Sequence, residues 1–288
     1  MHISVLAKEV LALLDPKTGE NFIDATVGEG GHAFSILEKI YPGGKLLGID
    51  LDKRAIENLK ERSTEIILVR GNFSFLKKIV EEKNFGPVSG ILADLGLSSN
   101  ELENSGKGFS FLKDEVLDMR LGSEGQTAAE LINSYGFEDL KEILEKFAEE
   151  KFASRIAKKI IEERKIKPIV TTFHLVEIIT QATPAFYHHQ RIHPATKTFQ
   201  ALRIAVNDEL NNLASFLGQA LEILIPGGRL AVISFHSLED RIVKNFFREN
   251  QRKSILKILT KKPVRPGPEE LVKNPRSRSA RLRIAIKI

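Results

Sequence analysis

The chain has 288 residues, of which 42% are hydrophobic and 28% charged, a balance typical of a folded globular protein rather than a disordered one. It contains no cysteine, which excludes disulfides, cysteine-ligated metal sites and thiolate nucleophiles. No apolar run approaches the roughly 20 residues of a membrane helix, and the first residues show no secretory pattern. We therefore expect a cytoplasmic protein with one domain, or one domain and an insert.

The net charge of +5 is unevenly distributed along the chain. Residues 252–288 contain 12 Lys and Arg against 2 Asp and Glu, whereas the rest of the chain is net acidic. A basic segment of this kind indicates a polyanionic partner such as nucleic acid. The alternative is a solvated basic tail.

The first hundred residues alternate between strand-like and helical patterns. Strands are predicted at residues 21–26, 45–50, 65–70 and 88–94, and helices from the glycines after the first strand to about residue 39 and over residues 53–62. Strands separated by helices form βαβ units, so we expect a parallel sheet with right-handed crossovers.

The alternation stops near Gly106, and residues 127–183 show only helical periodicity. Thr127 and Glu130 form a capping-box pattern at the start of the first helix. The sequence therefore predicts an all-helical insert, residues 106–196, in an α/β domain formed by residues 1–105 and 197–288.

The α/β pattern then resumes with a long helix over residues 198–224 and a strand at residues 229–235. A second capping-box pattern, from Ser237 to Asp240, predicts a helix that runs to about Glu249.

The last two strands are predicted at residues 255–260 and 281–286. Only a Pro- and Arg-rich loop and no helix is expected between them, so they can pair antiparallel. Seven strands ending in a hairpin are the layout of a class I methyltransferase sheet. The predicted fold class is thus α/β and Rossmann-like, with an inserted all-helical domain.

A glycine-rich turn, Asp24–His32, follows the first predicted strand. Glycines at such a turn let a ligand approach the backbone closely. Asp50 ends the second strand, where a carboxylate can accept hydrogen bonds from both hydroxyls of a ribose. Together these features indicate a cofactor that contains adenosine, because a plain tight turn would leave Asp50 unexplained.

Two cofactors compete for this turn. The dinucleotide fingerprint can be read from Gly28 with Ala33 at its third position, which that fingerprint accepts. Asp24 favours S-adenosylmethionine, because a carboxylate before the turn would repel a pyrophosphate but suits an ammonium group. We therefore expect S-adenosylmethionine rather than NAD.

Two further residues are expected to face this pocket. Phe73 follows the third strand and is predicted beside the adenine, with a core phenylalanine as the alternative. Asp94 ends the fourth strand, and ligands of open parallel sheets lie beyond the carboxyl ends of the strands. Its carboxylate can orient an exocyclic amine that accepts a methyl group, because oxygen acceptors on the amine hydrogens localise the lone pair. The alternative is a contact with the cofactor alone.

Four histidines and a basic loop complete the candidates. RNA contact or a structured loop is favoured over a metal site for His188, His189 and His193, because no Asp, Glu or Cys accompanies them at ligand spacing. No metal is therefore predicted. For His236, after the fifth strand, substrate contact competes with helix capping. The stretch Lys261–Ala280 is interpreted as an arm that binds phosphates.

Several long motifs occur in a fixed order along the chain. They are His2–Leu6, Asp24–His32, Asp94–Ser99, Gly108–Phe111, Leu117–Arg120, His193–Ile204, Ser234–Arg241 and Asn274–Ala280. In these motifs the chain resembles, nearly end to end, the bacterial 16S ribosomal RNA (cytosine-N4)-methyltransferases, the RsmH or MraW family.

The resemblance implies methylation of the N4 amine of a cytidine in the decoding centre of the small ribosomal subunit, with S-adenosylmethionine as donor. The cofactor-binding positions of the family carry over to Gly30, Gly31, His32, Asp50, Phe73 and Asp94, and Asp94 is also our candidate catalytic residue. Glu101 stands where the family has a cofactor-binding glutamine, and it can accept but not donate hydrogen bonds. Lys197 replaces a usual Arg and loses its two-pronged grip on phosphate.

Three functions are compared. The first is an S-adenosylmethionine-dependent enzyme acting on 16S rRNA, with no membrane partner and with a homodimer as one oligomeric state that the sequence allows. Its target cytosine would leave its stack so that N4 reaches the methyl group. The second is an NAD-dependent oxidoreductase, and the third is a non-catalytic ribosome-assembly factor that binds RNA through its basic end.

Overall fold

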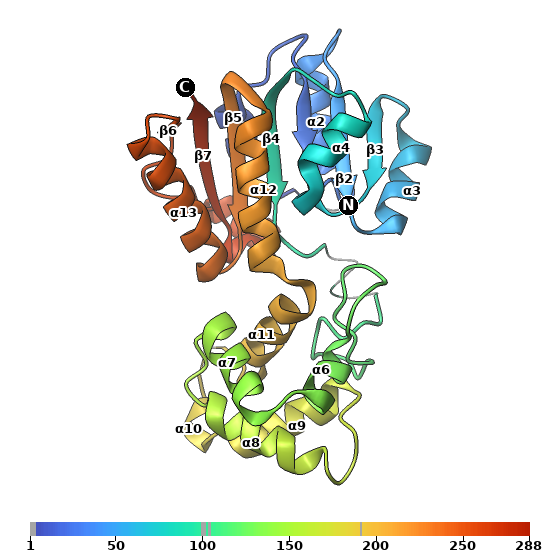
Figure 1. The fold of residues 1–288 in the computed structure, drawn as a ribbon, viewed down its shortest axis with the longest axis vertical. Helices are drawn as coiled ribbons and strands as arrows, with labels where there is room; N and C mark the ends of the chain where they lie inside the picture. The colour runs from blue at the N-terminus through green and yellow to red at the C-terminus, as the bar shows by residue number, and fades with distance from the viewer. Residues whose placement is uncertain (1–3, 99–101, 103–104, 191) are drawn as a thin grey trace. The chain divides into compact units, whose positions relative to one another are not determined.

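The computed structural model describes residues 4–98, 102, 105–190 and 192–288. The chain divides into two compact units, which are drawn in Figure 1. The α/β unit comprises Met1–Gly96 and Leu210–Ile288, and the helical unit comprises Leu97–Glu209. Of the helices that the structure describes, none has both the length and the apolar character needed to cross a membrane.

A seven-stranded sheet forms the centre of the α/β unit, in the order β3-β2-β1-β4-β5-β7-β6 (Figure 1). The strands are β1 (Phe22–Asp24), β2 (Leu46–Asp50), β3 (Ile66–Arg70), β4 (Val88–Asp94), β5 (Leu224–Ser234), β6 (Leu256–Ile258) and β7 (Arg281–Lys287). Strands β1 to β5 are parallel to one another, and β7 runs antiparallel between β5 and β6. The predicted class I methyltransferase fold is therefore confirmed.

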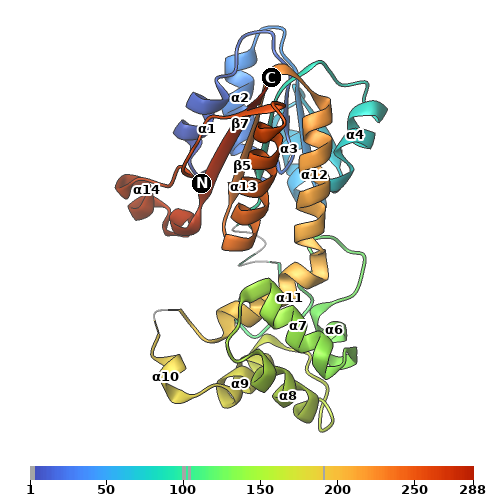
Figure 2. The same cartoon turned by 60° about the vertical axis from the view of Figure 1, so that its left-hand side comes forward.

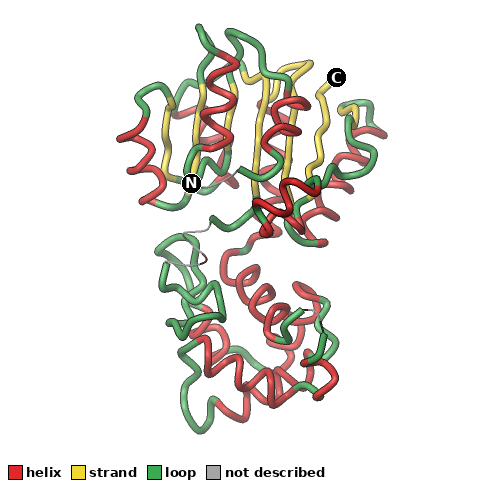
Figure 3. The backbone as a smooth tube through the Cα atoms, turned by 180° about the vertical axis from the view of Figure 1, so that it is seen from behind, coloured by secondary structure: helices red, strands yellow, loops and turns green. Residues whose placement is uncertain are grey.

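Helices cover both faces of this sheet (Figures 2 and 3). One face packs against α1 (Ala7–Leu14), α2 (Gly31–Ile40) and α3 (Lys53–Arg62), and the other against α4 (Leu76–Glu82), α12 (Glu209–Ile223) and α13 (Ser237–Arg252). Each face of the sheet has its own hydrophobic core, because successive side chains along a strand point to opposite faces. In β1, for example, Phe22 packs in the core beside α1, α2 and α3, and Ile23 packs in the core beside α4, α12 and α13.

Two predicted elements at the end of the insert and in the C-terminal stretch are wrong. The long helix predicted over residues 198–224 is two helices, α11 (Ala195–Asn207) and α12, because Asp208 takes a left-handed conformation with φ 48°. A helix does lie between β6 and β7, namely α14 (Pro268–Lys273). Its first residue is a proline, whose fixed φ and missing N–H suit the first helical position.

Two boundaries also differ from the prediction. The N-cap of α13 is His236 rather than Ser237, since His236 and Glu239 form the capping box. Strand β5 begins at Leu224 rather than at residue 229, because Leu224 pairs with Val88 of β4 before an irregularity in the register.

The helical unit has a core of its own. This core is built from α6 (Ala128–Ser134), α7 (Phe137–Ala148), α8 (Ala153–Glu163), α9 (Thr172–Ala182) and α11, and the unit also contains the short helix α10 (Ala185–His188). As predicted, α6 begins with a capping box in which the Glu130 N–H donates to Thr127 Oγ1 (3.1 Å) and the Thr127 N–H donates to Glu130 Oε2 (2.8 Å).

Candidate active site

Three aspartates lie at the carboxyl ends of neighbouring parallel strands in the α/β unit. Asp24 ends β1, Asp50 ends β2 and Asp94 ends β4. Asp24 pairs in register with Gly48 and Leu92, so Asp50 and Asp94 each lie two residues further along their strands. The sheet therefore places Asp24 deepest, between two more exposed carboxylates.

Asp24 is almost completely buried, with 1% of its surface exposed. Burial raises the pKa of Asp24 to about 7, against a partial offset from the His32 charge and from the Thr26 N–H, which donates to Asp24 Oδ1 (3.2 Å). A carboxyl group that remains half-protonated near neutral pH gains from a cationic ligand group, because such a group favours its charged form.

His32 lies in the first turn of α2 and has 8% of its surface exposed. Its Nε2 is 3.6 Å from Asp94 Oδ2, and this buried nitrogen has no hydrogen-bond partner among the described residues. Burial lowers the pKa of His32, but the nearby carboxylates of Asp94 and Asp24 outweigh burial, so its pKa is raised. A buried polar nitrogen without a partner is uncommon and fits contact with a ligand.

Asp50 is held by backbone N–H groups on both carboxylate oxygens. Gly28 donates to Oδ2 and Asp52 to Oδ1, each at 2.8 Å. Burial raises the pKa of Asp50, and these two hydrogen bonds offset the effect only in part. Each oxygen retains a second lone pair, so the carboxylate is fixed in place and can still accept two hydroxyl hydrogens.

The glycines of the turn serve different purposes. Gly28 has φ 48°, and a side chain there would meet only the Thr26 carbonyl oxygen, at 3.9 Å, so the space beside it is open. A Cβ at Gly30 would lie 2.6 Å from Leu59 of α3, and one at Gly31 would lie on the Ser4 hydroxyl. Close packing within the protein thus requires Gly30 and Gly31, whereas Gly28 leaves room for a ligand.

Asp94 is anchored through its backbone while its carboxylate stays accessible. Its N–H donates to Thr26 Oγ1 (2.7 Å), and Asp94 Oδ1 accepts from the Gly96 N–H (3.3 Å). The side chain keeps 20% of its surface exposed. Phe235, at the end of β5, borders the same position, because a Cβ on Gly96 would lie 2.7 Å from its ring.

Phe73 packs against the core, and its predicted position beside the adenine stays a prediction. It begins the short helix η1 (Phe73–Phe75), and its ring packs edge-on against Phe216 of α12 with centroids 5.3 Å apart. It packs against the core but remains partly exposed. Glu101, the other predicted cofactor residue, lies outside the described residues.

His236 caps the N-terminus of α13. Its Nδ1 accepts from the Glu239 N–H (3.4 Å), and the buried Glu239 carboxylate accepts from the N–H groups of Phe235 and His236. Among the other histidines, His188 Nε2 is hydrogen-bonded to Thr183 Oγ1 (2.9 Å), and His193 stacks on Phe111.

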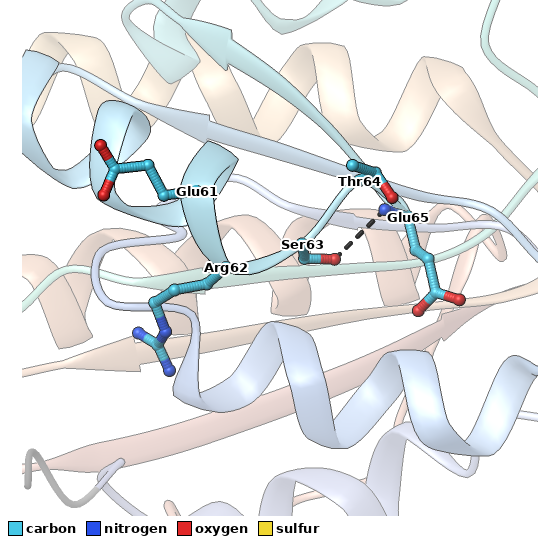
Figure 4. Close-up of a pocket in the computed structure, with 5 residues that line it drawn as sticks. All are labelled: Glu61, Arg62, Ser63, Thr64 and Glu65. Carbon is cyan, nitrogen blue, oxygen red and sulfur yellow. Dashed lines mark hydrogen bonds between the residues drawn. The ribbon is translucent and has the colours of Figure 1, made fainter.

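A hollow of about 300 Å³ lies elsewhere in the α/β unit, where α3 ends and β3 begins (Figure 4). Glu61–Glu65 line it, and the Glu65 N–H donates to Ser63 Oγ (3.2 Å). It lies at the amino end of β3, whereas ligands of open sheets bind beyond the carboxyl ends. The aspartate cluster is therefore the stronger candidate site.

Comparison with known proteins identifies the family. A profile described as the MraW methylase family matches residues 1–288. The chain belongs to the MraW methylase family. A relative from Heliobacterium mobile named ribosomal RNA small subunit methyltransferase H is 45% identical, with 100% of this chain and 99% of the relative covered. One of the same name from Persephonella marina is also 45% identical, at the same coverage.

Among solved structures, a methyltransferase homolog protein from Pyrococcus horikoshii is similar at 14% identity and a TM-score of 0.44, over 99% of this chain and 67% of the other. The family predicted from the motifs is thus confirmed by the sequence comparisons, and the chain is a methyltransferase that uses S-adenosylmethionine. The oxidoreductase alternative is wrong.

Two contacts at the site were not predicted from the sequence. Thr26, inside the glycine-rich motif, holds the Asp94 backbone, and a Thr two residues after a strand-end Asp was the available signal. Glu270 of α14 accepts from the Leu6 N–H (2.8 Å) and lies near enough to His32 to raise its pKa. Its separation of 264 residues from Leu6 leaves no local signal.

Proposed function

We propose that this methyltransferase modifies the N4 amine of a cytidine in the decoding centre of 16S rRNA. The names of the full-length relatives support a small-subunit rRNA substrate. The motifs shared with the cytosine-N4 family support the base and the atom. The observation that carries the proposal is the partly exposed carboxylate of Asp94 beside a buried His32. Thr26 holds the Asp94 backbone N–H, and the Gly96 N–H donates to the carboxylate.

The donor would be held by residues from three strand ends. Asp50 would accept the ribose hydroxyls, Asp24 would face the ammonium group, and Phe73 would contact the adenine. The proposed cofactor set also includes Gly30, Gly31, His32, Asp94 and Glu101. His32 Nε2, which makes no hydrogen bond to the described residues, and the open space at Gly28 fit such a ligand. When bound, S-adenosylmethionine supplies an electrophilic methyl group on a sulfonium.

Asp94 would act on the acceptor amine. An exocyclic amine of a nucleobase is a poor nucleophile, because its lone pair is delocalised into the ring. A fixed carboxylate that accepts an amine hydrogen would orient the amine and localise this lone pair. The Gly96 N–H and the nearby His32 would hold the carboxylate in position.

The basic C-terminal stretch would bind the RNA backbone. Within Lys261–Ala280 the cations are all exposed; they are Lys261, Lys262, Arg265, Lys273, Arg276 and Arg278. RNA affinity is mainly electrostatic, so an exposed cluster of this kind suits phosphate binding. We further propose residues 106–196 as the domain that recognises the substrate, and the cytoplasm, where ribosomal subunits are found, as the site of action. The homodimer stays a prediction.

The test is transfer of labelled methyl from S-adenosylmethionine to unmodified small ribosomal subunits and to naked 16S rRNA, followed by nucleoside analysis. N4-methylcytidine is the expected product, and comparing the two substrates shows which assembly state is recognised. Label in another nucleoside would contradict the proposed atom. No label in either substrate, with donor binding intact, would favour the assembly-factor alternative.

A further inference from the structure

An aromatic cluster lies where α10 meets the start of α8 in the helical unit (Figure 1). The Phe152 ring contacts the Tyr187 ring with centroids 4.9 Å apart and the Phe186 ring with centroids 6.1 Å apart. Tyr187 is buried, whereas 64% of the Phe186 surface is exposed. One ring of the cluster is thus presented to solvent on top of two others.

Hydrogen bonds hold this cluster in place, and the first of them is buried. The Tyr187 hydroxyl donates to Glu150 Oε2 (2.8 Å), and Glu150 Oε1 accepts from the Phe152 N–H (2.9 Å). The hydrogen bond between Thr183 and His188 fixes the other end of α10. The exposed ring therefore stands on a scaffold that is already ordered, which lowers the entropy lost when it binds a partner.

Three cations lie close to Phe152 in the chain, just before and along α8. The Arg155 guanidinium lies 5.7 Å from the centroid of the Phe152 ring, and the side chains of Lys151 and Lys158 are exposed. Within the part of the chain that the structure describes, none of these three forms an ion pair, whereas Lys159 pairs with Glu163. An exposed aromatic ring in a cluster that an arginine contacts has the chemistry of a surface that binds single-stranded nucleic acid, where bases stack and phosphates meet positive charge.

We propose that this surface stacks an unpaired base of the RNA substrate on Phe186 and binds the adjoining phosphates through Arg155, Lys151 and Lys158. We call it the Phe186 platform, defined as these four residues with Phe152. The inference rests on the proposed function and deepens it, because it requires a substrate with an unpaired base outside the active site. A protein partner is less favoured, since a single exposed ring among cations offers little apolar area.

The absence of tryptophan from the chain allows a direct test. Phe186→Trp introduces a single fluorophore, and we expect a short single-stranded oligoribonucleotide to quench it, with a duplex of the same sequence quenching far less. Phe173→Trp is the matched control, because Phe173 is 49% exposed in the same unit but its N–H donates to the acidic Asp114. Equal quenching of the two variants, equal quenching by duplex, or quenching by an acidic peptide instead would overturn the platform.

Kinetics give an independent readout. Phe186→Ala and Arg155→Ala should each raise the KM for RNA roughly tenfold, with kcat and donor affinity unchanged. An unchanged KM would contradict the platform. If the wild-type protein transfers no methyl to rRNA, the proposed function fails, and the fluorescence measurement still tests the platform by itself.

Discussion

Carboxylates are paired with arginines in the helical unit but not at the strand ends of the α/β unit. In the helical unit, Arg120 and Arg203 form two-pronged ion pairs with Asp118 and Glu209, with N–O distances of 2.8 to 2.9 Å. At the strand ends of the α/β unit, Asp24, Asp50 and Asp94 cluster with only His32 as a potential cation among the described residues.

The difference separates structural charges from functional ones. A carboxylate paired with Arg is already compensated and stabilises the fold. The same holds inside the α/β unit away from the strand ends, where Arg283 of β7 binds Asp240 of α13 at 2.7 and 3.1 Å. Buried carboxylates without such partners cost stability, and a site that retains them is prepared for a cationic ligand.

Removal of the Asp94 carboxylate should have the largest effect on methyl transfer. We expect Asp94→Ala to lower the rate of methyl transfer by roughly two to three orders of magnitude, the loss typical when one polar group that stabilises a transition state is removed. Single-turnover transfer at saturating donor and RNA measures the effect. Near-normal turnover with intact donor binding would eliminate the proposed role at the amine.

Asp24→Asn should stabilise the protein while weakening donor binding. The folded carboxyl keeps its proton up to about pH 7, whereas the unfolded one loses it near pH 3.8, so wild-type stability falls as pH rises through this window. Asn carries no charge to bury, and the variant should gain up to about 4 kcal/mol in the free energy of unfolding at pH 8, and less at pH 5. Denaturant titrations at both pH values, with calorimetric titration of the donor, test this. A variant less stable than wild type at pH 8 would contradict our view of Asp24.

Asp118→Asn is the counterpart in the helical unit. Burial raises the pKa of Asp118, but the hydrogen bonds and charge of Arg120 lower it more, so its net pKa is lowered. Its stabilisation is present above the unfolded pKa and is lost as pH falls through the folded one. We expect the variant to lose about 1–2 kcal/mol of unfolding free energy at pH 7 with donor affinity unchanged. A stability gain like that of Asp24→Asn would remove the distinction between the two regions.

Local patterns predicted the fold well, and long-range contacts explain most of what they missed. The helix over residues 53–62 and the strand over residues 88–94 match α3 and β4 in full, because cap, periodicity and strand composition all lie within each segment. The break at Asp208 has no Gly or Pro signal, since an aspartate there takes the left-handed conformation.

The strand-end acids were likewise found from their positions after predicted strands. The sequence did not predict the raised pKa of Asp24 or the missing hydrogen bond of His32 Nε2, because both depend on which strands are neighbours. Glu270 reaches this region only through the three-dimensional fold.

The exposed cations of the C-terminal stretch differ from both groups of carboxylates, because their removal should weaken RNA binding without changing the stability of the fold. Arg276→Ala combined with Arg278→Ala should weaken RNA binding several-fold at moderate salt and lower the slope of log affinity against log salt by roughly 1–2, because about 0.7 counterions are released per phosphate contact to a single strand. Lys53→Ala combined with Lys78→Ala is the control, since both lysines are exposed in the α/β unit but lie on α3 and α4, outside the basic C-terminal stretch. An unchanged salt slope in the Arg variant would show that this stretch does not bind the RNA backbone and would leave the Phe186 platform as the cationic surface to test.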